Sequence, residues 1–275
     1  MRRVIFNQKG GVGKSTISCN LAAISAARGK RTLVVDLDPQ SNTTRYLLGS
    51  LSEQVQPTLA EFFNEMLSFK FNRREVRDFI HSTPFPKLDL LPAHREMDFL
   101  HDKLGARYKI FKLREALDQL NEYYEIIIDT PPAMNFYTRS ALISASTVLI
   151  PFDCDDFSRR ALYQLMGDIE EIREDHNPNL RVEGIVVNQY QPRARLPQRL
   201  VAELSEEGLP LMRSCLTSSV KIRESHDQAQ PMVHLFPKHK VTGQFESLWD
   251  ELNGKAPAVD AVGEAVSYVA AAEPA

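Results

Sequence analysis

The sequence predicts an α/β protein with a doubly wound, mostly parallel sheet flanked by helices. Short apolar runs alternate with longer segments of helical spacing, which is typical of parallel sheets. The runs are rich in β-branched residues and leucine, as strands covered on both faces require. A glycine-rich loop joins the first run to the first helical segment. The predicted strands are residues 3–7, 32–36, 88–91, 125–129, 147–151 and 182–188.

The helical segments between these strands are residues 16–28, 59–67, 110–120, 160–174 and 196–207. Ligands of open parallel sheets bind at the carboxyl ends of the strands, so functional residues should follow the strands directly. We expect one domain over residues 1–253, of which residues 40–86 are the least regular part. The tail, residues 254–275, is rich in Ala and Val, which predicts a weakly held helix or a disordered segment.

Composition excludes several classes of protein. The 275 residues carry a net charge of −3, so nucleic-acid binding would need a local basic patch. The cysteines, Cys19, Cys154 and Cys215, form no C-x-x-C pair and predict reduced thiols. The chain has no apolar run of about 18 residues and no signal-like start, so we expect a cytoplasmic protein without a membrane span. The seven histidines fit no metal spacing, so we expect them at surface or turn positions.

The clearest motif is N-Q-K-G-G-V-G-K-S-T, residues 7–16, which we call the phosphate loop. Its strand–loop–helix context and its glycines allow backbone N–H groups to wrap phosphates at a helix N-terminus. Lys14 is expected to reach the β- and γ-phosphates, Ser15 to bind Mg²⁺, and Thr16 to lie near the α-phosphate. The spelling is unusual, because Gln8 replaces a glycine and Lys9 adds a second lysine. The residues expected at the nucleotide are Lys9, Gly10, Gly11, Val12, Gly13, Lys14, Ser15 and Thr16.

A dinucleotide-binding loop is the alternative interpretation of this motif. Gly11-Val12-Gly13 supplies a G-x-G, and Asp36 follows Gly13 by 23 residues, about where a ribose-binding acid would lie. The third glycine is missing, however, because Thr16 holds its place. A Lys-Ser pair also has no role in such a loop. The motif therefore favours a nucleoside triphosphate.

Acidic residues follow two further strands. Asp129 ends the buried run Ile126-Ile127-Ile128, a Walker B pattern in which the carboxylate holds Mg²⁺ through a water; an acid that merely caps the strand is the alternative. Asp36 and Asp38 follow another strand and point to the same side. We expect Asp36 to organise the waters of Mg²⁺ and Asp38 to orient the attacking water. The predicted metal residues are Ser15, Asp36 and Asp129, and the predicted catalytic residues are Lys9, Lys14 and Asp38.

These three motifs resemble the ParA/MinD family, P-loop NTPases with a deviant Walker A motif, and D-P-Q-S-N is closer to its ParA branch. The resemblance runs from the first strand to about Asn253. It implies ATP with Mg²⁺, and a homodimer of the ATP-bound form in which Lys9 crosses to the partner's ATP. A solvated Lys9 is the alternative. The resemblance also implies that Asn188 recognises adenine and that Pro192 lies in the loop beside the base; an Asn188 that only ends its strand remains an alternative.

Three functions fit an ATP-dependent dimer. A nitrogenase-reductase-like enzyme needs cluster cysteines in the middle of the chain, yet none lies between Cys19 and Cys154. A MinD-like membrane ATPase needs a basic amphipathic C-terminus, whereas the tail after Lys255 carries acids and no Lys or Arg. A ParA-like positioning ATPase binds DNA without sequence preference and has hydrolysis stimulated by an adaptor protein. We expect this third function, with localisation on the nucleoid.

A local basic surface is needed for that function. Residues 191–243 contain eight Lys or Arg against five acids, although the whole chain is acidic. Such a run is often only a solvated face, but two of its segments resemble those that ParA proteins turn toward DNA. The candidate DNA-binding residues are Arg193, Arg195, Lys221, Arg223, Lys238 and Lys240.

Two features depart from the ParA pattern. The strand at residues 147–151 is followed by an acidic cluster, Asp153, Asp155 and Asp156. The segment S-V-K-I-R, residues 219–223, replaces the usual Pro-Arg-Asn form. Both departures leave the cargo open. It could be a plasmid, a chromosome, or a large protein assembly such as a microcompartment, a storage granule or a chemoreceptor cluster.

Overall fold

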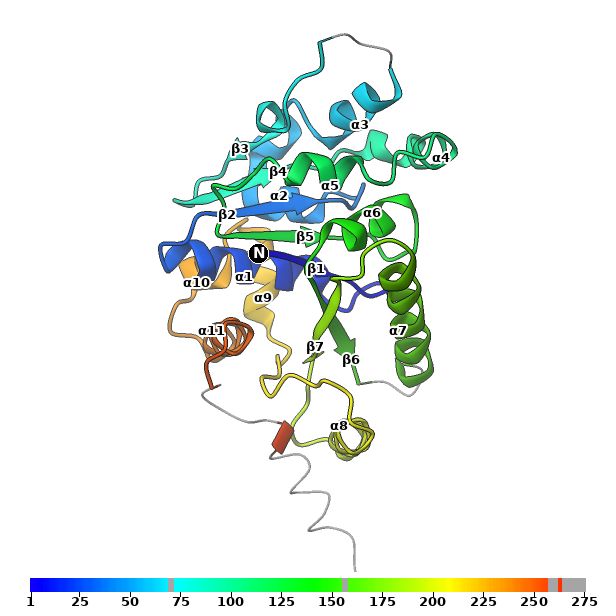
Figure 1. Ribbon diagram of the computed structural model, residues 1–275. Helices are drawn as coiled ribbons and strands as arrows, with labels where there is room; N and C mark the ends of the chain where they lie inside the picture. Colours follow the sequence, from blue (N-terminus) through cyan, green and yellow to red (C-terminus); the bar gives the residue numbers. More distant parts are fainter. Residues whose placement is uncertain (69–71, 155–157, 257–261, 264–275) are drawn as a thin grey trace, which may run out of the picture.

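The computed structural model describes residues 1–68, 72–154, 158–256 and 262–263, and within them one seven-stranded sheet forms in the order β3-β4-β2-β5-β1-β6-β7 (Figure 1). All neighbouring strands are parallel except β3 and β4, which are antiparallel. The predicted mostly parallel sheet is therefore confirmed. The strands are β1 (Arg2–Ile5), β2 (Thr32–Asp36), β3 (His81–Ser82), β4 (Leu88–Leu91), β5 (Glu125–Asp129), β6 (Thr147–Asp153) and β7 (Arg181–Asn188).

Helices cover both faces of this sheet, as a doubly wound fold requires. One face packs against α1, α2, α9, α10 and α11, and the other against α3 to α7 (Figure 1). Helix α8 lies beside β7. The helices are α1 (Lys14–Ala27), α2 (Asn42–Leu48), α3 (Leu59–Leu67), α4 (His101–Ala106), α5 (Lys112–Leu117), α6 (Phe136–Ser144), α7 (Ser158–Asp175), α8 (Arg195–Glu206), α9 (Val220–Asp227), α10 (Met232–Leu235) and α11 (Lys240–Leu252); the 3₁₀ turns are η1 (Gly49–Glu53), η2 (Val76–Phe79) and η3 (Arg95–Phe99).

The two faces of the sheet follow the alternation of strand side chains. Ile126 and Ile128 of β5 pack into the core under α3 to α7, while Ile127 between them packs into the core under α1 and α11. Because both faces are buried, the strand has no polar alternation. Strands 32–36, 88–91 and 125–129 and helix 59–67 form over the predicted residues.

Other predicted elements differ from the observed ones. The helix predicted over residues 110–120 forms only over Lys112–Leu117. Strand β3 was not predicted, because two residues are too short for a period-2 pattern. Helix α6 was not predicted either; nearly all of its residues are buried, so it lacks the polar face that marks a helix in a sequence. Most of the 254–275 tail lies outside the described residues, although Val262 is buried against Val187 and Val201.

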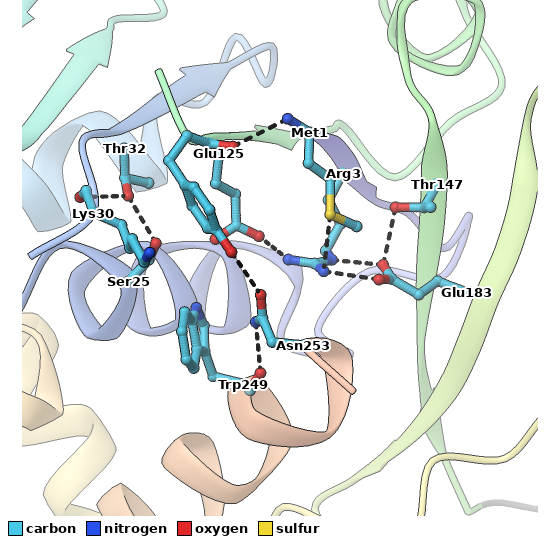
Figure 2. Close-up of polar contacts among 11 residues, drawn as sticks. Met1, Arg3, Ser25, Lys30, Thr32, Glu125, Thr147, Glu183, Trp249 and Asn253 are labelled. Carbon is cyan, nitrogen blue, oxygen red and sulfur yellow. Dashed lines mark hydrogen bonds and ion pairs between the residues drawn. The ribbon is translucent and has the colours of Figure 1, made fainter. Parts of the chain in front are cut away.

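A buried ion cluster joins the strands at the amino-terminal side of the sheet. Figure 2 shows the Arg3 guanidinium between Glu125 of β5 and Glu183 of β7. Arg3 is fully buried and donates to Glu183 at 2.6 and 2.8 Å. Thr147 of β6 donates to the same carboxylate at 2.9 Å. This cluster therefore ties four strands together, away from the carboxyl edge where ligands bind.

Replacing Arg3 by Ala should strongly destabilise the protein. The change leaves the buried Glu125 and the mostly buried Glu183 without their cation, and breaking a buried ion pair from one side costs about 3–5 kcal/mol. Chemical denaturation measures the loss. Arg2→Ala is the matched control, because its partner Asp118 is largely exposed, and exposed pairs contribute about 0–1 kcal/mol. Similar losses in both variants would contradict the assignment of Arg3 as a fold-defining residue.

Candidate functional site

The ends of five parallel strands bring the predicted site residues to one edge of the sheet. Strand β1 leads into the phosphate loop, β2 ends at Asp36, and β5 ends at Asp129. Because β1 lies between β5 and β6, and β5 lies between β1 and β2, these ends are neighbours. The carboxyl ends of β6 and β7 complete the edge with Asp153 and Asn188.

The phosphate loop needs glycine at two positions for different reasons. Gly11 and Gly13 have φ of 77° and 85°, a region that favours glycine. Gly13 also caps the start of α1, and a Cβ there would lie 2.3 Å from Asn188 Nδ2. The loop can therefore turn into α1 only with glycine at residue 13. The turn presents the amino-terminal N–H groups of α1 at the sheet edge, where anions bind favourably.

Side chains from the loop, from the last residue of β7 and from the residue after it hold both halves of the loop in place. Gln8, which stands where the usual motif has glycine, donates to Asp168 of α7 at 2.5 Å, so its side chain has an anchoring role that the motif alone did not reveal. The remaining contacts are Asn7 Nδ2 to the Pro151 carbonyl (2.7 Å), Asn188 Nδ2 to the Val12 carbonyl (2.9 Å) and Gln189 Nε2 to the Gly11 carbonyl (3.1 Å).

Lys14 lies under the loop with its ammonium group pointing back along it. Lys14 Nζ donates to the Lys9 carbonyl at 3.0 Å. Burial lowers the pKa of Lys14, while the nearby carboxylates of Asp129 and Asp38 oppose that change. The ammonium group is thus held between the loop and two acids, at the position from which it could reach a phosphate.

Asp129 has an environment that suits a hard cation. Its carboxylate is fully buried and accepts hydrogen bonds from the hydroxyls of Thr43 (2.7 Å) and Ser18 (3.2 Å). Burial raises the pKa of Asp129, and the hydrogen bond from Ser15 is the first effect that opposes it. A carboxylate and a hydroxyl side by side are oxygen donors of the kind that Mg²⁺ prefers, and Mg²⁺ keeps several waters and needs few protein ligands. Ser15 and Asp129 therefore fit the predicted metal site.

Asp36 uses both of its oxygens within the protein. One accepts from the Thr44 backbone N–H at 2.8 Å and the Thr44 hydroxyl at 2.7 Å, and the other accepts from the Asp38 N–H at 3.2 Å. Burial raises the pKa of Asp36 well above its usual value, with a further contribution from Asp129. Asp36 therefore holds the 36–44 segment in place, and any effect on a metal would pass through waters.

Asp38 lies two residues beyond the end of β2 and is mostly buried. Its Oδ1 accepts from the Gln40 N–H at 3.0 Å, which fixes the direction of the carboxylate. Burial raises its pKa, whereas the Gln40 hydrogen bond and the charge of Lys14 lower it. A carboxylate with a raised pKa is better able to take part in proton transfer near neutral pH.

Replacing Asp129 by Asn should stabilise the nucleotide-free protein. The raised pKa means that the folded state binds this proton more tightly than the unfolded state, whose Asp titrates near about 4. The contribution to the free energy of unfolding is therefore present below about pH 4 and is lost as pH rises through the folded-state pKa. Asn does not titrate, so we expect a gain of about 1 kcal/mol near neutral pH and a flatter pH dependence.

Thermal and denaturant unfolding between about pH 4 and 8 measure this effect. The exposed Asp175→Asn is the control and should change the free energy of unfolding by less than about 0.5 kcal/mol. An Asp129→Asn protein that is less stable than the parent at neutral pH would contradict the interpretation.

Lys9 lies at the rim of the site. Its Nζ is 3.6 Å from Asp153 Oδ2, with side chains that are 39% and 29% exposed. Asp153, the first residue of the acidic cluster, therefore contacts Lys9, the additional lysine of the phosphate loop. Asp155 and Asp156, the other members, lie outside the described residues.

A pocket of about 380 Å³ opens beside the loop. Asn188 lines it, while one of its amide hydrogens is used by Val12. Arg223, predicted as a DNA-binding residue, also lines it. Pro192 is not part of the described lining; its carbonyl accepts a hydrogen bond from Gln198 at 2.6 Å. The other described lining residues are Gly11, Gly13, Thr16, Gln189, Thr217, Ser218, Ser219, Val220 and Ile222.

The predicted DNA-binding cations lie at three places. Arg193 and Arg195 are exposed at the start of α8, and Lys238 and Lys240 are exposed at the start of α11. Lys221 of α9 is half-buried and donates to Glu224 at 2.6 Å, which partly neutralises its charge. Its ammonium group also lies 4.7 Å from the centre of the Phe236 ring. This contact places α9 beside the 236–240 turn.

The described residues contain neither a candidate membrane span nor a candidate metal cluster. No helix in the described part of the chain is long and apolar enough to cross a membrane. Among the same residues, no group of three or more His, Cys, Asp or Glu side chains is arranged to hold a metal ion.

Solved structures of other proteins share this fold. Among solved structures, the fold is similar to that of Cyanothece McdA in its ATP complex (TM-score 0.78, 22% identity, 94% of this chain and 98% of that chain). It is also similar to Mycobacterium smegmatis cobyrinic acid a,c-diamide synthase with bound ATP analog and magnesium (TM-score 0.74, 23% identity, 94% and 98%). At these identities the likeness concerns the fold alone.

Sequence relatives identify the family. A family model described as an AAA domain matches residues 3–182. The chromosome partitioning protein ParA of Myxococcus xanthus is 36% identical over 73% of this chain and 69% of its own length. The protein of the same name from Caulobacter vibrioides is 31% identical over 83% and 85%. The resemblance seen in the motifs is thereby confirmed: the chain belongs to the ParA family of P-loop partition ATPases.

Proposed function

We propose that this chain is an ATP-dependent switch that dimerises on ATP, binds duplex DNA without sequence preference and positions a cargo on the nucleoid. A partner protein would stimulate its otherwise slow hydrolysis. The observation that carries the proposal is the meeting of Lys14, Asp38 and Asp129 under a phosphate loop whose second lysine, Lys9, lies at the rim. Such a site can bind a triphosphate while its exposed rim remains open to contact with a second chain.

ATP and Mg²⁺ would occupy the carboxyl edge of the sheet. The backbone of residues 10–13 and the start of α1 would hold the phosphates, and Lys14 would neutralise part of their charge. Ser15 and Asp129 would hold Mg²⁺, with Asp36 acting through its waters. Mg²⁺ would supply charge neutralisation at the phosphate oxygens. Asp38 would orient the attacking water, and Asn188 would contact the base from the lining of the pocket.

The dimer would form across the exposed rim of the site. Two triphosphates that face each other need positive charge between them, and Lys9 would supply it. Lys9 would exchange its contact with Asp153 for the partner's nucleotide. Dimerisation would then depend on the γ-phosphate, and hydrolysis would release the two chains.

DNA binding would use the cations of α9 and the 236–240 turn, with those at the start of α8. Each protomer offers exposed Arg193, Arg195, Lys238 and Lys240, and a dimer doubles each patch. Phosphate contacts of this kind are independent of sequence and depend strongly on salt. The nucleotide pocket and the DNA surface share α9, because Arg223 lines the pocket and Lys221 adjoins Phe236.

The test is retention of the protein on random-sequence duplex DNA with ATP or ADP, at about 50 and 200 mM salt. We expect retention with ATP only, and its loss at the higher salt. Replacing Lys238 and Lys240 by Ala removes four cations per dimer. The slope of the logarithm of the binding constant against the logarithm of the salt concentration should therefore become shallower by about 3 to 4. Lys103→Ala with Lys109→Ala, on the opposite side of the sheet, is the charge-matched control and should leave it unchanged.

Equal retention with both nucleotides would contradict an ATP switch on DNA. No retention with either would favour the alternative, a MinD-like ATPase that associates with membrane or with a protein partner. Sedimentation with anionic lipid vesicles in the presence of ATP then distinguishes association with a membrane from association with a protein partner.

A further inference from the structure

A histidine of α9 contacts the phosphate loop directly. His226 Nε2 lies 2.9 Å from Thr16 Oγ1, within hydrogen-bonding distance. His226 is 210 residues away in the sequence and was expected at the surface or in a turn; it is instead half-buried in a helix. Thr16 is the loop residue expected at the α-phosphate. The contact therefore joins the predicted nucleotide site to α9.

The imidazole ring is fixed by its neighbours. It stacks on Tyr46 of α2, with ring centres 3.9 Å apart and an angle of 16° between the planes. The Tyr46 hydroxyl lies 2.8 Å from the hydroxyl of Ser225, the residue before His226. Ring stacking and the adjacent hydrogen bond together leave little freedom to turn. The ring nitrogen therefore stays at the Thr16 hydroxyl.

A second contact fixes the backbone of Thr16. Asn20 Nδ2 donates to the Thr16 carbonyl at 2.8 Å, and Asn20 Oδ1 accepts from the Met232 N–H at 2.8 Å. The first turn of α1 is thus tied to α10 as well as to α9. The carbonyl of Thr16 is bound by Asn20, and its hydroxyl oxygen is in contact with His226. Only the direction in which the Thr16 O–H proton points can therefore vary.

That direction depends on the state of the imidazole. Burial lowers the pKa of His226, so the ring is neutral near neutral pH, and Nε2 either accepts or donates. If Nε2 accepts, the Thr16 proton points to the ring and only a lone pair faces the site. If Nε2 carries the proton, it donates to Thr16 Oγ1, and the Thr16 proton can point away. A phosphate oxygen only accepts, so it requires the second arrangement.

We propose that His226 is a nucleotide-positioning residue, whose Nε2–H donates to Thr16 Oγ1 and turns the Thr16 proton toward a phosphate oxygen of the bound nucleoside triphosphate. This inference rests on the proposed binding of a triphosphate at the phosphate loop. It adds a consequence for α9: the helix that carries Lys221 and Arg223 is held against the loop by the same hydrogen bond.

Equilibrium binding of a fluorescent ATP analogue with Mg²⁺ tests the assignment. His226→Phe keeps a flat ring for Tyr46 and removes both nitrogens, so we expect affinity to fall about three- to tenfold, as for one lost hydrogen bond. His226→Gln restores an N–H near the position of Nε2 and should bind within about twofold of the parent. His234→Phe is the matched control, because His234 also stacks on an aromatic ring, Phe85, and should bind like the parent.

A double-mutant cycle separates positioning from packing. In a Thr16→Val protein the hydroxyl is absent, so adding His226→Phe should cause no further loss of affinity. Additive losses would overturn the inference, as would a His226→Phe protein that binds like the parent, or one that binds no worse than His226→Gln. A parent protein that does not bind the analogue would instead overturn the proposed function, and this inference with it.

Discussion

Replacing Asp38 by Ala is expected to reduce ATP hydrolysis at least about 100-fold while leaving ATP binding intact. Asp38 lies beyond the end of β2, and its carboxylate is aimed by the Gln40 N–H. Burial raises its pKa, which suits a group that orients and activates water. The change leaves the backbone of the phosphate loop intact, and Lys14 keeps the Lys9 carbonyl and the charge of Asp129. The ATP-bound dimer should therefore accumulate, because the step that ends it is slow.

Single-turnover hydrolysis and size-exclusion chromatography with ATP measure the two effects. Asp175→Asn is a suitable control, because Asp175 is an exposed aspartate at the end of α7. Its removal should leave hydrolysis near the parental rate. An Asp38→Ala protein that hydrolyses ATP at the parental rate would remove Asp38 from the mechanism.

Replacing Lys9 by Ala is expected to prevent ATP-dependent dimerisation without preventing ATP binding. Lys9 is at the exposed rim, whereas Lys14 is buried beneath the loop, so only Lys9 is placed to reach a second chain. Loss of one charged partner in a desolvated pair costs about 2–5 kcal/mol. In the proposed dimer, two such lysines would face two nucleotides. We therefore expect at least about a 30-fold weaker dimer, since 1.4 kcal/mol is tenfold in an equilibrium constant.

Asp153→Asn should change dimerisation in the opposite direction. Asp153 lies 3.6 Å from Lys9 Nζ within the chain, so its neutralisation should weaken this restraint on Lys9 and lower the protein concentration at which the ATP dimer forms. The pair is partly exposed, so the change should be small, about two- to fivefold, consistent with at most about 1 kcal/mol. Analytical ultracentrifugation with ATP compares the three proteins. A Lys9→Ala protein that dimerises like the parent would contradict the role of Lys9 between chains.

The sheet was predictable because its strands carry a strong local signal. The runs at 32–36, 88–91 and 125–129 are mostly apolar, and their apolar side chains are buried on both faces of the sheet. The phosphate loop was predictable for a similar reason: its glycines, lysines and serine are adjacent in the sequence. Helix α6 was not predictable, since a helix in which nearly every residue is buried lacks a polar face.

The contacts between distant segments required the tertiary structure. The sequence of the loop does not predict that Gln8 contacts Asp168, that Lys9 contacts Asp153 or that Thr16 contacts His226. Each partner lies more than 140 residues away along the chain. Asp36 was expected near the waters of a metal, yet its oxygens are used by Thr44 and Asp38. Arg223 was predicted to bind DNA from its charge and from the resemblance of its segment to ParA proteins, and the fold places it in the lining of the pocket beside the phosphate loop.

The sequence by itself determined the fold class, the family and the residues of the phosphate loop, because these depend on local patterns of burial and on chemistry that is contiguous along the chain. Only the tertiary structure decided which carboxylate is left to face a ligand, which side chain restrains each lysine, and which helix contacts the loop. Those outcomes depend on the packing of strands and helices whose register brings together residues far apart in the sequence.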